Sequence, residues 1–140
     1  MYGYNRIELD ELIGKTFTSV RRVVDSNDDE SIVFEGPEGS YAMYHSQDCC
    51  ESVYLVDFDE SELSLLENSP ILYATEDSKD VSGQPTGESN PDGTYFYTYD
   101  DLAIWTFYNI STNKGTVNLR WFGSSNGWYG VSVNIVKLSN

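Results

Sequence analysis

Basic side chains are scarce in this chain, and acidic side chains are absent from its last part. The 140 residues include 8 lysines and arginines against 23 aspartates and glutamates, so the formal net charge is −15. All the acids lie between Glu8 and Asp101, and residues 102–140 carry only basic charge. Direct binding to nucleic acid depends on clustered lysine and arginine, so the composition disfavours it. The acidity either serves solubility or forms a surface for a basic partner.

Long apolar runs are also missing. The chain has no stretch of about 18 apolar residues, and its start lacks the basic and then apolar pattern of a secretory signal. We therefore expect a cytoplasmic protein with no membrane partner. The two cysteines are too few for a disulfide framework. A length of 140 residues predicts one domain over 1–140.

Helical periodicity is scarce, whereas short alternating apolar runs between turn-forming residues are common. This pattern predicts an α+β fold that is predominantly β, with an antiparallel sheet and one or two short helices. Strands are predicted at 16–25, 31–35, 41–45, 53–58 and 71–74, and short helical segments at 7–13 and 61–66. The turn-forming residues 36–39 predict a hairpin between the strands at 31–35 and 41–45. The apolar content of 53–58 predicts a strand that is buried on both faces.

The last part of the chain predicts a C-terminal three-stranded meander over 95–109, 116–122 and 128–136. Two turns that each end in glycine separate these strands. In the last strand, the two-residue period places Tyr129, Val131, Val133 and Ile135 on one face. The strand before it places Val117, Leu119 and Trp121 on one face in the same way. The first strand of the meander has apolar residues on both faces. Before the meander, glycines and prolines among polar residues predict a flexible loop at 77–93.

The segment from His45 to Glu51 contains the only histidine and both cysteines. A zinc site would need four ligands, of which His45 and Cys49 could be two. A nucleophilic Cys–His pair would need a hydrogen bond between the two side chains and a third group to orient them. We favour a packed corner with one buried cysteine and a hydrogen-bonded His45. No cofactor and no metal are predicted.

Three acid-rich segments, 25–30, 57–62 and 76–101, are candidates for contact with a partner. Solvated turns are the plainer interpretation of such segments. The calcium-loop pattern does not match at Asp25 or at Asp57, and phosphate-binding and nucleophile-elbow motifs are missing, so we expect no enzyme. The candidate partner-binding residues are Asp25, Asp28, Asp29, Glu30, Asp57, Asp59, Glu60, Glu62, Glu76, Asp77, Asp100 and Asp101.

Three strings cover most of the chain and carry a resemblance. They are IGKTFTSV at 13–20, YHSQDCCESVYLVD at 44–57 and WTFYNISTNKGTVNLRWFGSSNGWYGVSV at 105–133. They resemble a family of small, mostly phage-encoded proteins of uncharacterised function. The resemblance implies a phage or prophage gene whose product acts in the bacterial cytoplasm, and it supplies no catalytic residues.

In that setting the leading hypothesis is an acidic protein that inhibits a host defence nuclease of the CRISPR or restriction type. Its carboxylates would occupy the DNA-binding site of the nuclease by mimicry of DNA. The partner is then a basic nucleic-acid-binding host protein, an inference from setting rather than from a site. The alternative is a non-enzymatic phage structural or regulatory protein, or a small-ligand-binding module, centred on His45, Cys49 and Cys50. Its pocket would include the aromatic residues next to the cysteines.

Overall fold

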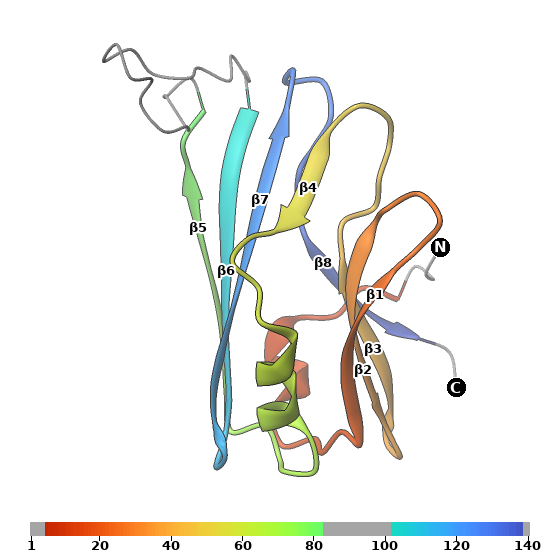
Figure 1. The fold of residues 1–140 in the computed structure, drawn as a ribbon, viewed down its shortest axis with the longest axis vertical. Helices are drawn as coiled ribbons and strands as arrows, with labels where there is room; N and C mark the ends of the chain where they lie inside the picture. The colour runs from red at the N-terminus through yellow and green to blue at the C-terminus, as the bar shows by residue number, and fades with distance from the viewer. Residues whose placement is uncertain (1–4, 83–101, 139–140) are drawn as a thin grey trace.

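The computed structural model describes residues 5–82 and 102–138, which form a β-sandwich of two antiparallel four-stranded sheets (Figure 1). The first sheet has the order β1-β2-β3-β8, and the second has the order β4-β7-β6-β5. Two short 3-10 helices, η1 (Leu9–Leu12) and η2 (Glu60–Leu66), complete the described structure. The prediction of a predominantly β fold with short helices is confirmed.

The first sheet is built on a hairpin of β2 (Glu30–Gly36) and β3 (Gly39–Tyr44). The hairpin was predicted at this place, and Gly39 takes a φ of +134° in its turn, a region that favours glycine. On the other side of β2 lies β1 (Ser19–Val24), and beyond β3 lies β8 (Asn134–Leu138). The outer edge of β8 is covered in turn, because Lys137 donates its N–H to the carbonyl of Asn5 at 2.8 Å.

The second sheet is built on a long hairpin of β6 (Leu102–Thr112) and β7 (Gly115–Ser125). Two shorter strands form the edges of this sheet. These are β4 (Ser52–Leu55), which pairs with β7, and β5 (Tyr73–Asp80), which pairs with β6.

The core lies between the sheets, because alternate side chains of each strand face inward. One apolar cluster joins residues of both sheets to the two short helices. In β7, Val117, Leu119 and Trp121 are buried as the alternation predicted. The prediction that the strand before it is apolar on both faces is also confirmed, since Tyr108 faces the core and Ala103 packs in a separate outer cluster.

The predicted meander is only half correct. Its first two strands form the β6–β7 hairpin, but the last strand pairs with β3 of the other sheet and begins at Asn134 instead of Trp128. Val131 and Val133 are buried as predicted, whereas Tyr129 is only half-buried, and all three lie outside any strand. Alternation therefore identified the inward face but could not identify the partner strand. The segment lies close to β7, because a Cβ on Gly123 would be 2.6 Å from the Cβ of Val131.

Two further predictions need correction. None of the four residues of β4 is fully buried, because this strand is an edge of its sheet rather than a central strand. The predicted loop at 77–93 begins too early, since residues 77–80 belong to β5. The rest of that loop from residue 83 onward, and the start of the predicted strand at 95–101, lie outside the described residues.

Candidate functional site

A pocket of about 810 Å³ lies between the β1–β2 turn and the loop that joins β3 to β4. Both connections are at the end of the sandwich away from η2 (Figure 1). Among the described residues that line the pocket, His45 is the one basic side chain. The lining includes five carboxylates, from Asp25, Asp28, Asp29, Glu30 and Glu51. The structure therefore joins the first acid-rich segment to the histidine and cysteine segment in one site.

The β1–β2 turn places the first four carboxylates. The side chain of Asp25 accepts hydrogen bonds from the N–H groups of Asn27 at 2.8 Å and of Asp29 at 3.1 Å. Asp28 has a φ of +62°, a left-handed conformation that aspartate tolerates better than most residues. The turn thus uses Asp25 as a structural group and leaves the side chains of Asp28 and Asp29 outside these hydrogen bonds.

The charges of this turn act on one another. Partial burial, and second the charge of Asp25, raise the pKa of the Asp29 carboxyl group. His45 acts in the opposite direction on that pKa. Glu30 has a cationic partner of its own, because Arg22 Nε lies 2.9 Å from its carboxylate. Glu30 and Glu51 therefore each have a side-chain partner, Arg22 and His45, whereas Asp25 and Asp28 act on Asp29 as like charges.

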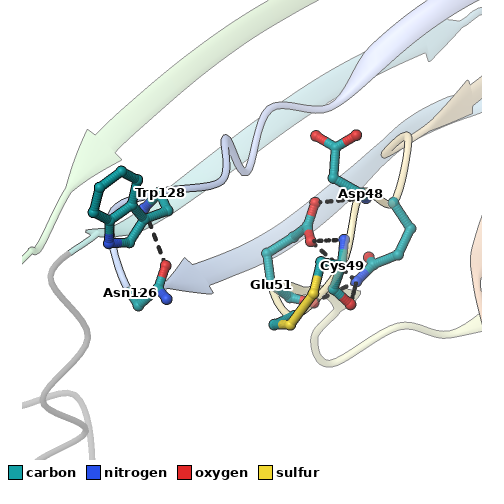
Figure 2. The surroundings of a disulfide bond; sticks show 7 residues. Asp48, Cys49, Glu51, Asn126 and Trp128 are labelled. Atoms are coloured by element: carbon teal, nitrogen blue, oxygen red, sulfur yellow. Dashed lines mark hydrogen bonds between the residues drawn. A yellow bond between two sulfur atoms is a disulfide. The ribbon is translucent and has the colours of Figure 1, made fainter.

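Glu51 organises the β3–β4 loop from a buried position (Figure 2). Its side chain is 0% exposed and accepts hydrogen bonds from the N–H groups of Asp48 and Cys49, each at 2.9 Å. Gln47 Nε2 also donates to the Glu51 carbonyl at 2.6 Å. Burial alone would raise the pKa of this carboxyl group, but the N–H groups of Cys49 and Asp48 and the His45 ring lower it to about 2. Glu51 is therefore a buried carboxylate ion at neutral pH.

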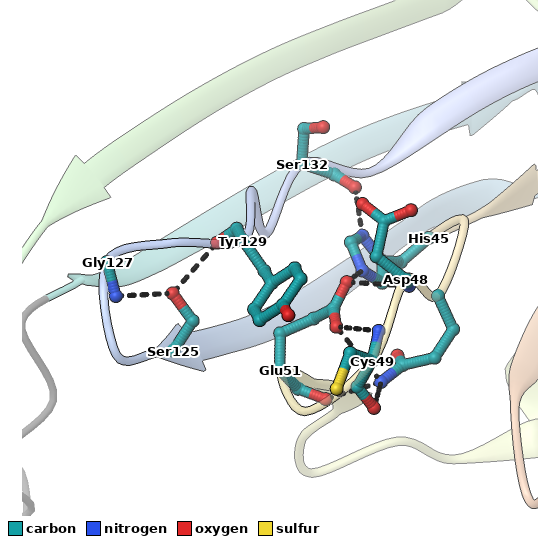
Figure 3. Close-up of polar contacts among 9 residues, drawn as sticks. His45, Asp48, Cys49, Glu51, Ser125, Gly127, Tyr129 and Ser132 are labelled. Atoms are coloured by element: carbon teal, nitrogen blue, oxygen red, sulfur yellow. Dashed lines mark hydrogen bonds and ion pairs between the residues drawn. The ribbon is translucent and has the colours of Figure 1, made fainter.

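His45 links this carboxylate to the segment before β8 (Figure 3). Its Nδ1 lies 2.7 Å from the carbonyl oxygen of Ser132, and its Nε2 lies 2.9 Å from Glu51 Oε2. Both ring nitrogens therefore lie against acceptor oxygens, and the two contacts fix the orientation of the ring. The prediction of a hydrogen-bonded His45 is confirmed.

The cysteines differ from the prediction. Cys49 and Cys50 form a disulfide with each other, and both residues are exposed. The expected buried cysteine is therefore wrong, because Glu51 takes the buried position in this corner. With both His45 nitrogens and the Cys49 sulfur engaged, these atoms form neither a nucleophilic pair nor a metal site in this structure. Over residues 5–82 and 102–138, no three His, Cys, Asp or Glu side chains are grouped to bind a metal ion.

The second acid-rich segment lies apart from the pocket, and two of its members have structural partners. Asp57 pairs with Arg120 at 3.0 Å, and Arg120 also lies over the Trp105 ring. Asp59 caps η2 by accepting the N–H of Ser61 at 3.0 Å. Glu60 and Glu62 follow on η2 and are exposed.

The third segment is at the opposite edge of the second sheet from β4. Glu76 and Asp77 lie on the edge strand β5 and are exposed. Asp100 and Asp101 are outside the described residues. The structure therefore does not gather the described carboxylates of the three segments into one surface.

Sequence reasoning gave no role to two residues of the site. These are Glu51 and Gln47. The spacing of His45 and Glu51 held a usable signal, because an acid six residues after the only histidine can close a loop with it. The hypothesis of a ligand-binding module included the aromatic residues next to the cysteines without naming them, and Tyr44 and Tyr54 are two such residues.

The fold and the site together define a β-sandwich protein with an acidic pocket between two loops at one end. The chain belongs to a family described as a domain of unknown function, DUF7448, which matches residues 10–135. No curated protein and no solved structure matches the chain. Within the described residues, no helix has the length and apolar character that a membrane crossing requires.

Proposed function

We propose that this protein is a non-enzymatic binding protein whose acidic pocket holds a positively charged segment of a protein partner. The observation that carries the proposal is the pocket lining, which contains five carboxylates and, as its one basic side chain, His45. The volume of about 810 Å³ lies within the range of roughly 300–1,000 Å³ that is typical of ligand pockets. Tyr44 and Tyr54 add aromatic surface to the lining, and arginine and lysine side chains bind well to such faces.

The partner class is a basic nucleic-acid-binding host protein, with a defence nuclease of the CRISPR or restriction type as the first candidate. Two observations support it: the confinement of all acids to residues 8–101, and the resemblance to phage-encoded proteins. A nuclease binds DNA or RNA through clustered basic residues, and an acidic protein is steered toward such a surface by charge. In this proposal the protein acts in the bacterial cytoplasm and excludes DNA from the site that it occupies.

The test compares two variants that each remove two carboxylates. D28N/D29N changes the pocket without removing the Asp25 hydrogen bonds that hold the turn, and E60Q/E62Q removes two exposed charges from η2. Each variant is mixed with a purified defence nuclease, and cleavage and DNA binding are measured at low and at high salt.

The expected result is that D28N/D29N inhibits less than wild type while E60Q/E62Q resembles wild type, and that high salt weakens the inhibition. Equal inhibition by all three proteins would contradict the pocket as the binding site. Complete inhibition with DNA still bound to the nuclease would contradict mimicry of DNA.

A small cationic ligand is the second candidate, because the five carboxylates line the same pocket as His45 and Cys49. Spermidine is a suitable probe, since it carries several ammonium groups and fits the charge of the lining. Calorimetric titration of wild type and D28N/D29N distinguishes the two candidates. A saturable site for spermidine that D28N/D29N loses, without any inhibition of nucleases, would favour the small ligand.

A further inference from the structure

The disulfide at the pocket joins neighbouring residues, which is an unusual use of such a bond. Most structural disulfides stabilise a fold because they close a chain loop, and the gain grows with the length of that loop. No residue lies between Cys49 and Cys50, so this bond closes no loop of that kind. Both cysteines are also exposed, and exposed disulfides are the ones that exchange readily with thiols. The bond is therefore better suited to exchange than to stabilising the sandwich.

The dipeptide is connected to the hydrogen bonds that shape the pocket wall (Figure 2). The N–H of Cys49 donates to Glu51 Oε1 at 2.9 Å, and the carbonyl of Cys49 accepts from Gln47 Nε2 at 3.3 Å. The other carboxylate oxygen of Glu51 bonds to His45. A change in the backbone of the dipeptide therefore acts directly on the groups that fix this loop.

We infer that the Cys49–Cys50 disulfide is a site of reversible thiol–disulfide exchange with an external dithiol, and that its reduction remodels the pocket wall. The disulfide closes a small ring through the two side chains and the peptide bond between them. Once the bond is broken, the dipeptide can become extended, and an extended backbone turns neighbouring side chains to opposite sides. The N–H of Cys49 then leaves Glu51. The exchange does not depend on the proposed function, whereas the effect on binding rests on it.

The chemistry balances with the dithiol as the reductant. A thiolate of the dithiol attacks one cysteine sulfur, the bond between the two cysteine sulfurs breaks, and the sulfur that leaves takes up a proton. The second thiol of the dithiol then attacks the mixed disulfide, and the other cysteine leaves as a thiol. Two electrons and two protons have moved to the protein, and the dithiol has become a disulfide. In a reducing compartment such as the expected cytoplasm, disulfides are usually transient, so the pair would cycle there.

The first experiment counts thiols and follows the loop in the full chain. Protein purified in air is treated with a thiol-alkylating reagent before and after dithiothreitol, and the added mass is measured. Amide NMR spectra are recorded for both forms. We expect no label before reduction and two labels after it, with shifted amide signals for Asp48 and Cys49 and unchanged signals for core residues such as Trp121.

Two results would overturn the inference: labelling of both cysteines in the protein purified in air, or reduction that leaves the Asp48 and Cys49 amides unmoved. The C49S/C50S variant is the matched control, because it holds no disulfide and should give the spectrum of the reduced loop with or without dithiothreitol. A C49S/C50S spectrum that matches the oxidised wild type would also contradict the inference that loss of the disulfide remodels the loop.

The second experiment separates this inference from the proposed function. Binding of a fluorescent oligo-arginine peptide is measured for oxidised and reduced wild type. We expect the two affinities to differ by at least about fivefold, the lower end of typical coupling between sites. Amide signals that shift on reduction, without peptide binding by either form, would contradict the proposed function but not the disulfide exchange. Equal peptide affinity of the two forms, together with unchanged amide signals, would contradict the remodelling of the pocket wall but not the proposed function.

Discussion

His45 and Glu51, six residues apart, form a buried contact of 2.9 Å between the ring Nε2 and the carboxylate that closes the β3–β4 loop on itself. The histidine side chain is 7% exposed and the carboxylate 0% exposed. Buried ion pairs are stable only when further hydrogen bonds satisfy the remaining groups. Ser132, Asp48 and Cys49 supply those bonds from the backbone. The loop is thus held by its charges rather than by an apolar cluster.

Replacement of this carboxylate should be costly. E51Q removes the charge that accepts two backbone N–H groups and pairs with His45, and we expect the free energy of unfolding to fall by about 2–3 kcal/mol. Urea unfolding at pH 7 measures it. E62Q is the control, since Glu62 is exposed on η2 and should change stability by less than about 0.5 kcal/mol. Equal stability of E51Q and wild type would show that the contact contributes nothing net.

The same residue should make stability depend on acid. The pKa of Glu51 is lowered to about 2 in the folded protein, below its ordinary value of 4.5. The stabilisation is therefore fully present above pH 4.5 and is lost as the pH falls toward 2. Urea unfolding of wild type and E51Q between pH 7 and pH 2 measures this loss. The other carboxylates titrate in both proteins, so their contribution cancels in the difference between the two free energies of unfolding. The difference between the two should narrow below pH 4.5, and a constant difference would contradict the assignment.

Replacement of Asp29, unlike replacement of Glu51, should weaken binding without lowering stability. Burial and the charge of Asp25 raise the pKa of Asp29, so the ionised carboxylate of Asp29 is less stable in the folded than in the unfolded protein. We expect D29N to leave stability unchanged or raise it by up to about 0.5 kcal/mol, while binding of the basic probe weakens. D57N is the matched control, because Asp57 pairs with Arg120 at the surface, and its loss should cost less than about 1 kcal/mol. Thermal unfolding and peptide titration of both variants would settle the comparison.

Close packing of the segment before β8 on β7 can be tested at two glycines. G123A places a methyl group 2.6 Å from the Cβ of Val131, and overpacking of this kind costs about 1–3 kcal/mol. G130A is the control, since nothing lies within 4 Å of the position of its Cβ. Urea unfolding should show a loss for G123A alone. Similar losses for both variants would indicate that backbone freedom, and not contact with Val131, is the cause.

The sequence predicted local structure better than it predicted partners. The β2–β3 hairpin, the helical turn at Glu60–Leu66 and the inward faces of β7 were recovered because turn residues and alternation act over a few positions. The partner of β8 was missed, since alternation is the same whichever strand lies beside it. The exposed edge position of β4 was missed for the same reason.

The site was predicted in pieces. The sequence drew attention to 25–30 and to 45–51 separately, but only the fold places these segments on opposite walls of one pocket. It also treated all the acids alike. In the structure Asp25 holds a turn, Asp59 caps a helix and Asp57 has an ionic partner. A count of charges cannot separate such structural carboxylates from those that can bind a partner, because the difference lies in the hydrogen bonds that each one already makes.

The pairing of β3 with β8 also sets the order of events when the chain is made. Tyr44 pairs with Asn134, ninety residues later in the sequence, and Ser40 pairs with Leu138. During synthesis the β1–β2–β3 hairpins can form early, but the open edge of β3 must wait for the last strand to leave the ribosome. Open strand edges promote association between chains, and contacts between distant residues form slowly. Until β8 arrives, the nascent protein is in the state most exposed to aggregation and to capture by chaperones.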